Sequence, residues 1–219
     1  MKPILFNTKM VRAIMDGRKI QTRRIMKPQP PATAIVEMTG RYAVWKFWSD
    51  DPSGHLIKPP YNLGDILYVR ETWDNEPVTP GGHFRPLGVW YYKADGDLRP
   101  DAWRGNWHPS IHMPKKAARI FLRVKRIGVE RLRDITIQDA IAEGCEGVIC
   151  DHPNPEPGIG CTDCLNTGWI ESPIIEFAEL WDSTIKPVDY EKYGWGANPW
   201  VWVIEYERCE KPVEGDGRK

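Results

Sequence analysis

The sequence predicts a single α+β domain with short helices, several strands and long insertions between them. Two kinds of pattern predict this class, because apolar residues recur at helical spacing in some stretches and alternate with polar residues in others. The 219 residues also include 20 Pro and 11 Trp, which indicates a loop-rich fold with aromatic anchors. A chain of this length suits one domain with elaborations, over residues 1–209.

Charge and cysteine content limit the possible partners and compartment. Lys plus Arg and Asp plus Glu each number 30, so nucleic acid could be bound only through a local basic patch such as residues 18–24. No stretch approaches the ~18 apolar residues of a membrane span, and the N-terminus lacks the apolar region of a signal peptide. We therefore expect a cytoplasmic protein with no membrane partner, whose five Cys are reduced thiols or metal ligands.

The first predicted element is a helix over residues 8–16, with apolar residues at i, i+3 and i+4 and with Thr8 as its expected N-cap. Gly17 fits the left-handed position that ends a helix. The basic octet, residues 17–24, follows and holds four cations, one hydroxyl and one amide. Most charge runs of this kind are solvated surface faces, which is the simpler interpretation.

An extended basic octet would place Lys19, Gln21 and Arg23 on one side, and Thr22 and Arg24 on the other. Lys19 and Thr22 can then converge only if a bend or bulge turns one toward the other. A lysine beside a hydroxyl and partly removed from water would have a lowered pKa and could activate that hydroxyl as a nucleophile. Lys19 and Thr22 are therefore candidate catalytic residues.

Residues 27–117 predict strands separated by Pro-rich and Trp-rich segments. Alternation over residues 42–48 indicates a strand or hairpin, and a Gly-Asp turn leads into another strand over residues 63–73. Glu71 ends the mostly apolar face of that strand and could belong to the site, although pairing with an arginine is the more common use of such a carboxylate. Residues 74–117 form an insertion long enough to have structure of its own or a function.

A predicted strand over residues 119–125 is followed by a helix over residues 136–143. Thr136 and Asp139 have the spacing of a capping box, and Gly144 fits the position after the helix. Glu143 lies in the last turn, where the helix dipole disfavours an anion. We therefore expect Glu143 either to have a cationic partner or to be kept for function.

The second insertion, residues 145–171, carries the pattern of a metal site. Cys161 and Cys164 have the Cys-x2-Cys spacing that holds tetrahedral zinc, and Cys150 with His152 supplies two further ligands. Cys145 could replace His152, and free thiols in a loop are the alternative. Four protein ligands leave no open position, so a zinc ion here would be structural, and no cofactor is expected for catalysis.

The C-terminal part predicts a helix that begins at Ser172 and Pro173, with Pro at its first position. Residues 196–208 are a nearly continuous apolar, β-forming run, which predicts a central strand. The charged, Gly-rich residues 210–219 predict a disordered tail.

The order of these elements resembles the ASCH superfamily of PUA-like β-barrels. The resemblance rests on Gly-x-Lys-x-x-Thr-x-Arg at 17–24, Gly-Asp-x-Leu-x-Val at 64–69 and Trp-Val-Ile-Glu-Tyr at 202–206. ASCH proteins of phages and prophages have stretches similar to 108–114 and 198–205. The resemblance spans residues 4–208 and implies a mixed PUA-like β-barrel with peripheral helices and long Pro/Trp-rich insertions.

The family signature, GxKxxExR, has Glu where this chain has Thr22. The same departure occurs in the small bacterial ASCH enzyme that hydrolyses N(4)-acetylcytidine to cytidine and acetate. The resemblance therefore implies hydrolysis of an N(4)-acylated cytidine, with Thr22 as nucleophile, Lys19 as base and Glu143 handling a proton or orienting Lys19. It also implies that Arg23 and Arg24 recognise phosphate, a base edge or the developing oxyanion. Glu71, from its place at the end of the predicted strand, is the third candidate substrate-binding residue.

A second function remains open, which is RNA binding by a PUA-like module. Lys19, Arg23 and Arg24 would then contact the RNA backbone, while the Trp-rich insertions would stack on bases. Some family members are also reported as ribonucleases, which would use the same basic cleft. The expected partner is thus a modified nucleoside or RNA. The Lys, Thr and Glu set favours the nucleoside, and the long loops favour RNA.

Overall fold

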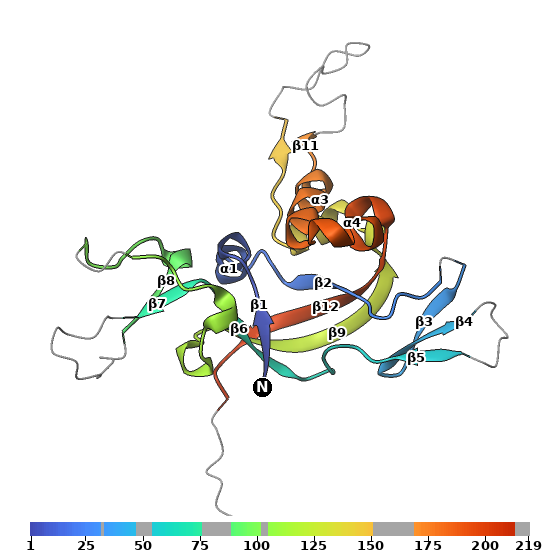
Figure 1. The fold of residues 1–219 in the computed structure, drawn as a ribbon, viewed down its shortest axis with the longest axis horizontal. Helices are drawn as coiled ribbons and strands as arrows, with labels where there is room; N and C mark the ends of the chain where they lie inside the picture. The colour runs from blue at the N-terminus through green and yellow to red at the C-terminus, as the bar shows by residue number, and fades with distance from the viewer. Residues whose placement is uncertain (32, 47–53, 76–88, 102–104, 151–168, 213–219) are drawn as a thin grey trace, which may run out of the picture. The chain divides into compact units, whose positions relative to one another are not determined.

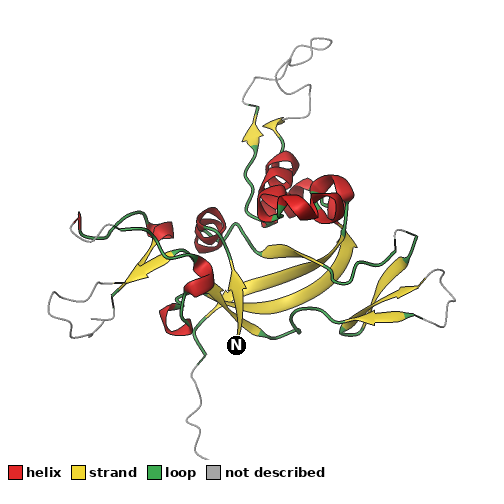
Figure 2. Ribbon diagram, viewed as in Figure 1, coloured by secondary structure: helices red, strands yellow, loops and turns green. Residues whose placement is uncertain are grey.

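A computed structural model gives the fold of residues 1–31, 33–46, 54–75, 89–101, 105–150 and 169–212 (Figure 1). It combines several small sheets with short helices, which confirms the predicted α+β class (Figure 2). The largest set of strands is hydrogen-bonded in the order β1, β6, β9, β12, β2, and the described strands do not close a barrel. None of the helices in the described ranges is long and apolar enough to span a membrane.

The chain divides into two compact units, each made from separate segments. Unit 1 contains residues 1–17, 64–125 and 206–219, and unit 2 contains residues 18–63 and 126–205. Two long strands, β9 (Phe121–Arg131) and β12 (Trp200–Cys209), contribute to both units.

In unit 1 a parallel strand pair is extended by an antiparallel neighbour. Ile4 lies opposite Val69 in the parallel pair, and Leu67 lies opposite Leu122 in the antiparallel pair. All four side chains are buried, so both pairs contribute to the core of the unit. The elements of unit 1 are β1 (Lys2–Leu5), α1 (Thr8–Met15), β6 (Ile66–Arg70), β7 (Trp73–Asn75), β8 (Trp90–Tyr92) and the 3-10 helices Lys93–Asp95, Ser110–His112 and Lys115–Ala117.

The N-cap of helix α1 lies one residue before the position that the sequence predicts. Asn7 is the N-cap, because its side chain accepts a hydrogen bond from the Met10 N–H, and Thr8 is already the first helical residue. Thr8 as the N-cap is therefore wrong. Gly17 has a φ of +78°, which confirms the predicted left-handed position after the helix.

Unit 2 holds helices packed on a β2–β12 ladder and a separate sheet in the order β3, β4, β5. Its core joins Phe177 and Trp181 of α3 to Val201 of β12. The predicted Ser172 cap and Pro173 start of α3 are confirmed. The elements of unit 2 are β2 (Gln21–Ile25), β3 (Ile35–Thr39), β4 (Tyr42–Lys46), β5 (His55–Ile57), α2 (Ile137–Ala142), β10 (Val148–Ile149), β11 (Trp169–Glu171), α3 (Pro173–Thr184), α4 (Tyr190–Tyr193) and the 3-10 helices Leu132–Asp134, Pro187–Asp189 and Trp195–Ala197.

The outer edge of β2 is defined by its pairing with β12. The Met26 N–H donates to the Trp200 carbonyl at 3.0 Å, and hydrogen-bonded pairs alternate along an antiparallel ladder. Arg24 and Thr22 therefore direct their backbone groups toward β12, whereas Gln21, Arg23 and Ile25 direct theirs away from it. The prediction that the basic octet runs extended is confirmed for its last four residues, which form most of β2.

Candidate functional site

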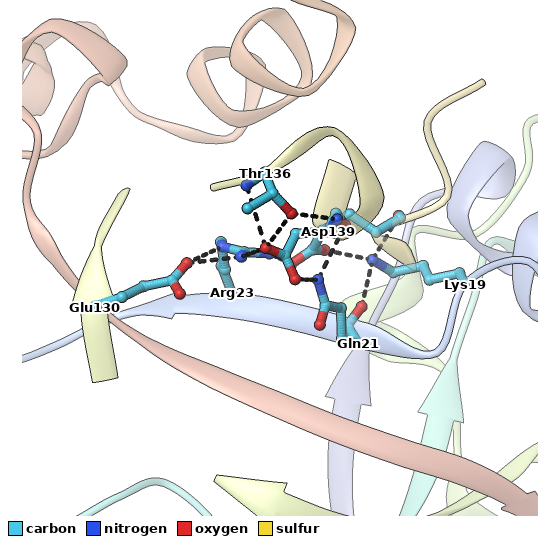
Figure 3. A network of polar contacts seen from close by, with 7 residues as sticks. Lys19, Gln21, Arg23, Glu130, Thr136 and Asp139 are labelled. Carbon is cyan, nitrogen blue, oxygen red and sulfur yellow. Dashed lines mark hydrogen bonds and ion pairs between the residues drawn. The ribbon is translucent and has the colours of Figure 1, made fainter. Parts of the chain in front are cut away.

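Lys19 lies just before β2 and is fully buried, with 0% of its side chain exposed. Its ammonium donates to the Glu143 Oε2 at 2.7 Å, to the Glu143 carbonyl at 2.8 Å and to the Gln21 carbonyl at 3.0 Å (Figure 3). An ammonium has three donors, so each of its protons has an acceptor. This arrangement offsets part of the cost of removing the charge from water.

Glu143 is held in place by the end of α2. The predicted capping box is present, because Thr136 and Asp139 exchange hydrogen bonds at the start of the helix. Glu143 is the C-cap residue, and Gly144 follows with a φ of +94°. The negative end of the helix and the carboxylate both favour a cation here, and the expected cationic partner of Glu143 is Lys19.

Arg23 extends the contact into a network of side chains. Its Nη1 donates to the Glu143 Oε1 at 3.1 Å, and its Nε donates to the Glu130 Oε1 at 2.7 Å. The guanidinium carbon also lies 5.7 Å from the centre of the Phe177 ring. Both oxygens of Glu143 are therefore used by cations, Oε2 by Lys19 and Oε1 by Arg23.

Gln21 and Asp139 form the polar rim of this network. The Gln21 side-chain amide donates to the Asp139 carbonyl at 2.9 Å and to its Oδ1 at 3.1 Å. The Thr136 hydroxyl donates to the Asp139 Oδ2 at 2.7 Å. Figure 3 shows these side chains converging on the start of α2. Asp139 thus caps the helix and fixes the β2 side chains at the same time.

Burial and hydrogen bonding change the protonation equilibria of the network. Desolvation lowers the pKa of Lys19, and the attraction of Glu143 opposes that change. Desolvation likewise raises the pKa of Glu130, against the effect of Arg23. Burial opposes ionisation of Asp139, but hydrogen bonds from Thr136 and Gln21 more than offset it, so its pKa is lowered.

Thr22 lies between Gln21 and Arg23 in β2 and is buried, with an exposed fraction of 2%. Because successive strand side chains point to opposite faces, Thr22 points away from the face that carries the Gln21 and Arg23 side chains. The Lys19 ammonium, however, binds the Gln21 carbonyl, which belongs to the peptide bond that leads into Thr22. The ammonium therefore lies at the strand edge, beside the backbone of Thr22.

The structure also places the three expected substrate-binding residues. Arg23 is enclosed by carboxylates, and its side chain is 0% exposed. Arg24 is partly exposed and lies on the Thr22 face of β2. Glu71, in unit 1, accepts from the Nε and Nη2 of Arg119 at 2.9 and 3.0 Å, which is the arginine pairing expected as the simpler use of this carboxylate.

The predicted zinc ligands His152, Cys161 and Cys164 lie outside the described residues. Cys150 is described and follows β10 directly. Strands β10 and β11 pair antiparallel, so the two ends of the segment between them are held together. Within the described residues, no group of three or more His, Cys, Asp or Glu side chains could hold a metal ion.

Glu130 belongs to the network but was not a candidate from the sequence. The predicted strand over residues 119–125 continues as β9 to Arg131, which is longer than the alternation indicates. Continued alternation would have placed Glu130 on the face of Leu122 and Val124, where a carboxylate needs a cationic partner. Gly128 within the strand weakens that signal.

A scan against protein-family models, a search of curated proteins and a search of solved structures found no match to this chain. The class of this protein thus rests on its fold and its site. It is a mixed α+β protein with a buried ion pair between a lysine and a glutamate.

Proposed function

We propose that this chain is an ASCH-type amidohydrolase that removes the acyl group from an N(4)-acylated cytidine or a similar small amide on a nucleoside. The observation that carries the proposal is the buried contact of Lys19 with Glu143 at 2.7 Å, at the peptide bond that precedes Thr22. It brings together, in one unit, the lysine of the basic octet and the carboxylate that the family resemblance pairs with it.

Lys19 would act in its neutral form. Burial lowers its pKa, which raises the fraction of neutral amine at a given pH. The amine would take the proton of the Thr22 hydroxyl as the oxygen attacks the acyl carbon. That proton would pass, by way of Lys19 or Glu143, to the departing exocyclic nitrogen as the carbon–nitrogen bond breaks. Water would then cleave the threonine ester, releasing a carboxylic acid and regenerating the hydroxyl.

The test is acetate release from N(4)-acetylcytidine by the purified protein. We expect turnover in the wild type and in Thr22→Ser, which keeps a hydroxyl. We expect loss of turnover in Thr22→Val, which has nearly the same volume as threonine but no hydroxyl, and in Lys19→Met. Turnover that persists in Thr22→Val, or no turnover in the folded wild type, would contradict the proposal.

RNA binding, the alternative function, has less support, because most of the cations that were expected to contact RNA are buried. The side chains of Lys19 and Arg23 are 0% exposed and both are engaged by carboxylates, so neither can contact an RNA backbone without rearrangement. Of the three cations expected to contact RNA, only Arg24 is partly exposed. An RNA-binding or ribonuclease role would therefore have to use other cations of the surface.

A further inference from the structure

A cavity of about 320 Å³ lies in unit 2, beside the C-terminal end of β2. Arg24 and Lys27 line it on one side, and Trp181 and Thr184 of the last turn of α3 line it on the other. None of the described residues around this cavity is acidic. It is termed the β2–α3 cavity below.

Arg24 and Lys27 both contribute positive charge to the lining of the β2–α3 cavity. Arg23 also lines it, but its guanidinium is held by Glu130 and Glu143. A second cavity in the same unit, of about 240 Å³, is lined by carboxylates as well as by an arginine. An anion is therefore attracted to the β2–α3 cavity and disfavoured at its neighbour, whose acidic lining residues are Glu130, Asp139 and Glu205.

The β2 backbone adds a neutral donor to these two cations. Ile25 lines the cavity, and the alternation along the β2–β12 ladder directs its N–H away from β12. The Trp181 indole is fixed because its Nε1 donates to the Tyr193 carbonyl at 2.8 Å, so it provides an apolar wall. Cationic side chains beside a backbone N–H that points away from its own ladder are groups that recognise phosphate oxygens.

We propose that the β2–α3 cavity binds a phosphate group, so that the substrate of the reaction is an N(4)-acylated cytidine monophosphate and not the free nucleoside. This inference rests on the proposed function for the identity of the base. Arg24 follows Thr22 by two residues on the same face of β2, a rise of about 7 Å along a strand. In this proposal one nucleotide spans from Thr22, which takes the acyl group, to Arg24 and Lys27, which take the phosphate.

The first experiment measures binding by calorimetry, without any reaction. We expect cytidine 5′-monophosphate to bind the wild type at least about tenfold more tightly than cytidine, which corresponds to ~1.4 kcal/mol. Lys27→Gln should remove most of this preference and leave the affinity for cytidine unchanged. Equal affinities for the two ligands in the wild type would overturn the proposal.

Lys192→Gln is the matched control. The Lys27 and Lys192 ammonium groups lie 5.1 and 5.2 Å from the centre of the same Tyr193 ring, but only Lys27 lines the cavity. Lys192→Gln should therefore keep the preference for the monophosphate. An equal loss in both variants would mean that net charge alone causes the preference, and would overturn the site.

A second experiment separates this inference from the proposed function. Hydrolysis of N(4)-acetylcytidine with no preference for its 5′-monophosphate would leave the reaction standing and refute the phosphate site. Lys27-dependent binding of cytidine 5′-monophosphate without hydrolysis of either compound would support the phosphate site and refute the reaction. Tighter Lys27-dependent binding of a short cytidine oligonucleotide than of the monophosphate would assign the cavity to a nucleic-acid strand and overturn the mononucleotide.

Discussion

Lys19 and Glu143 are 124 positions apart in the chain, and their side chains meet at 2.7 Å with 0% and 2% of their surfaces exposed. Removing one member of such a pair leaves the other charge buried with fewer partners. Arg23 remains beside Glu143 in that case, but it binds only the Oε1 atom. The contact is therefore expected to contribute to stability whatever chemistry it serves.

Lys19→Met should lower the free energy of unfolding by about 3–5 kcal/mol, because the Glu143 Oε2 loses its cation in a buried position. Urea denaturation measures this change. The control is Lys125→Met, which removes an ion pair to Glu207 at 3.3 Å whose side chains are 55% and 49% exposed. That change should cost no more than ~1 kcal/mol. Similar losses in the two variants would show that burial adds nothing at Lys19.

The sequence was sufficient to predict the parts of the site that depend on local rules. The capping box at Thr136 and Asp139, the left-handed Gly17 and Gly144, and a cationic partner for Glu143 all follow from helix-end physics. Alternation also placed Lys19, Gln21 and Arg23 on one side, and all three enter one network.

Other features depend on contacts that no local pattern encodes. The N-cap of α1 is Asn7 and not Thr8. Asparagine and threonine are both good N-caps, and only the backbone conformation selects between two such neighbours. Strand β1 was missed because it is four residues long, contains Pro3 and pairs in parallel with a strand more than sixty residues away. Glu130 was missed because the length of β9 is set by its neighbours.

The protonation of Lys19 should be measurable by NMR of its side-chain methylene next to the ammonium. We expect its pKa below the ordinary value of 10.5, because desolvation outweighs the attraction of Glu143. Glu143→Gln removes that attraction, so the pKa should fall further. Between the lowered pKa and 10.5 the unfolded chain binds more protons than the folded one, so stability should rise with pH across this window. A Lys19 pKa at or above 10.5 would contradict the prediction.

Tyr92 provides a second pH test, in unit 1. Desolvation raises the pKa of Tyr92 from 10.0 to about 12, and its hydroxyl donates to the Ala117 carbonyl at 2.6 Å. Because the folded pKa is the higher one, this contribution to stability is complete below pH 10 and is lost as the pH rises toward 12. Ultraviolet titration should show a late phenol ionisation that is missing in Tyr92→Phe. Loss of an early phase instead would refute the assignment.

The predicted zinc site can be tested by metal analysis of protein prepared without added zinc. We expect about one equivalent of zinc per chain and a lower melting temperature after chelation. Cys161→Ser should lose the metal. The buried Cys145 is the alternative ligand, so Cys145→Ser with zinc retained would assign His152 as the fourth ligand. A protein that is free of metal and equally stable with chelator would refute the site.

The division of the chain into units has a consequence for synthesis on the ribosome. The two segments of unit 2, residues 18–63 and 126–205, are separated by more than sixty residues that belong to unit 1. The buried contact of Lys19 with Glu143 therefore cannot form until residue 143 has been translated. Folding of this unit therefore has to wait for residues 126–205, and the transfer of the Lys19 amine out of water is a late event.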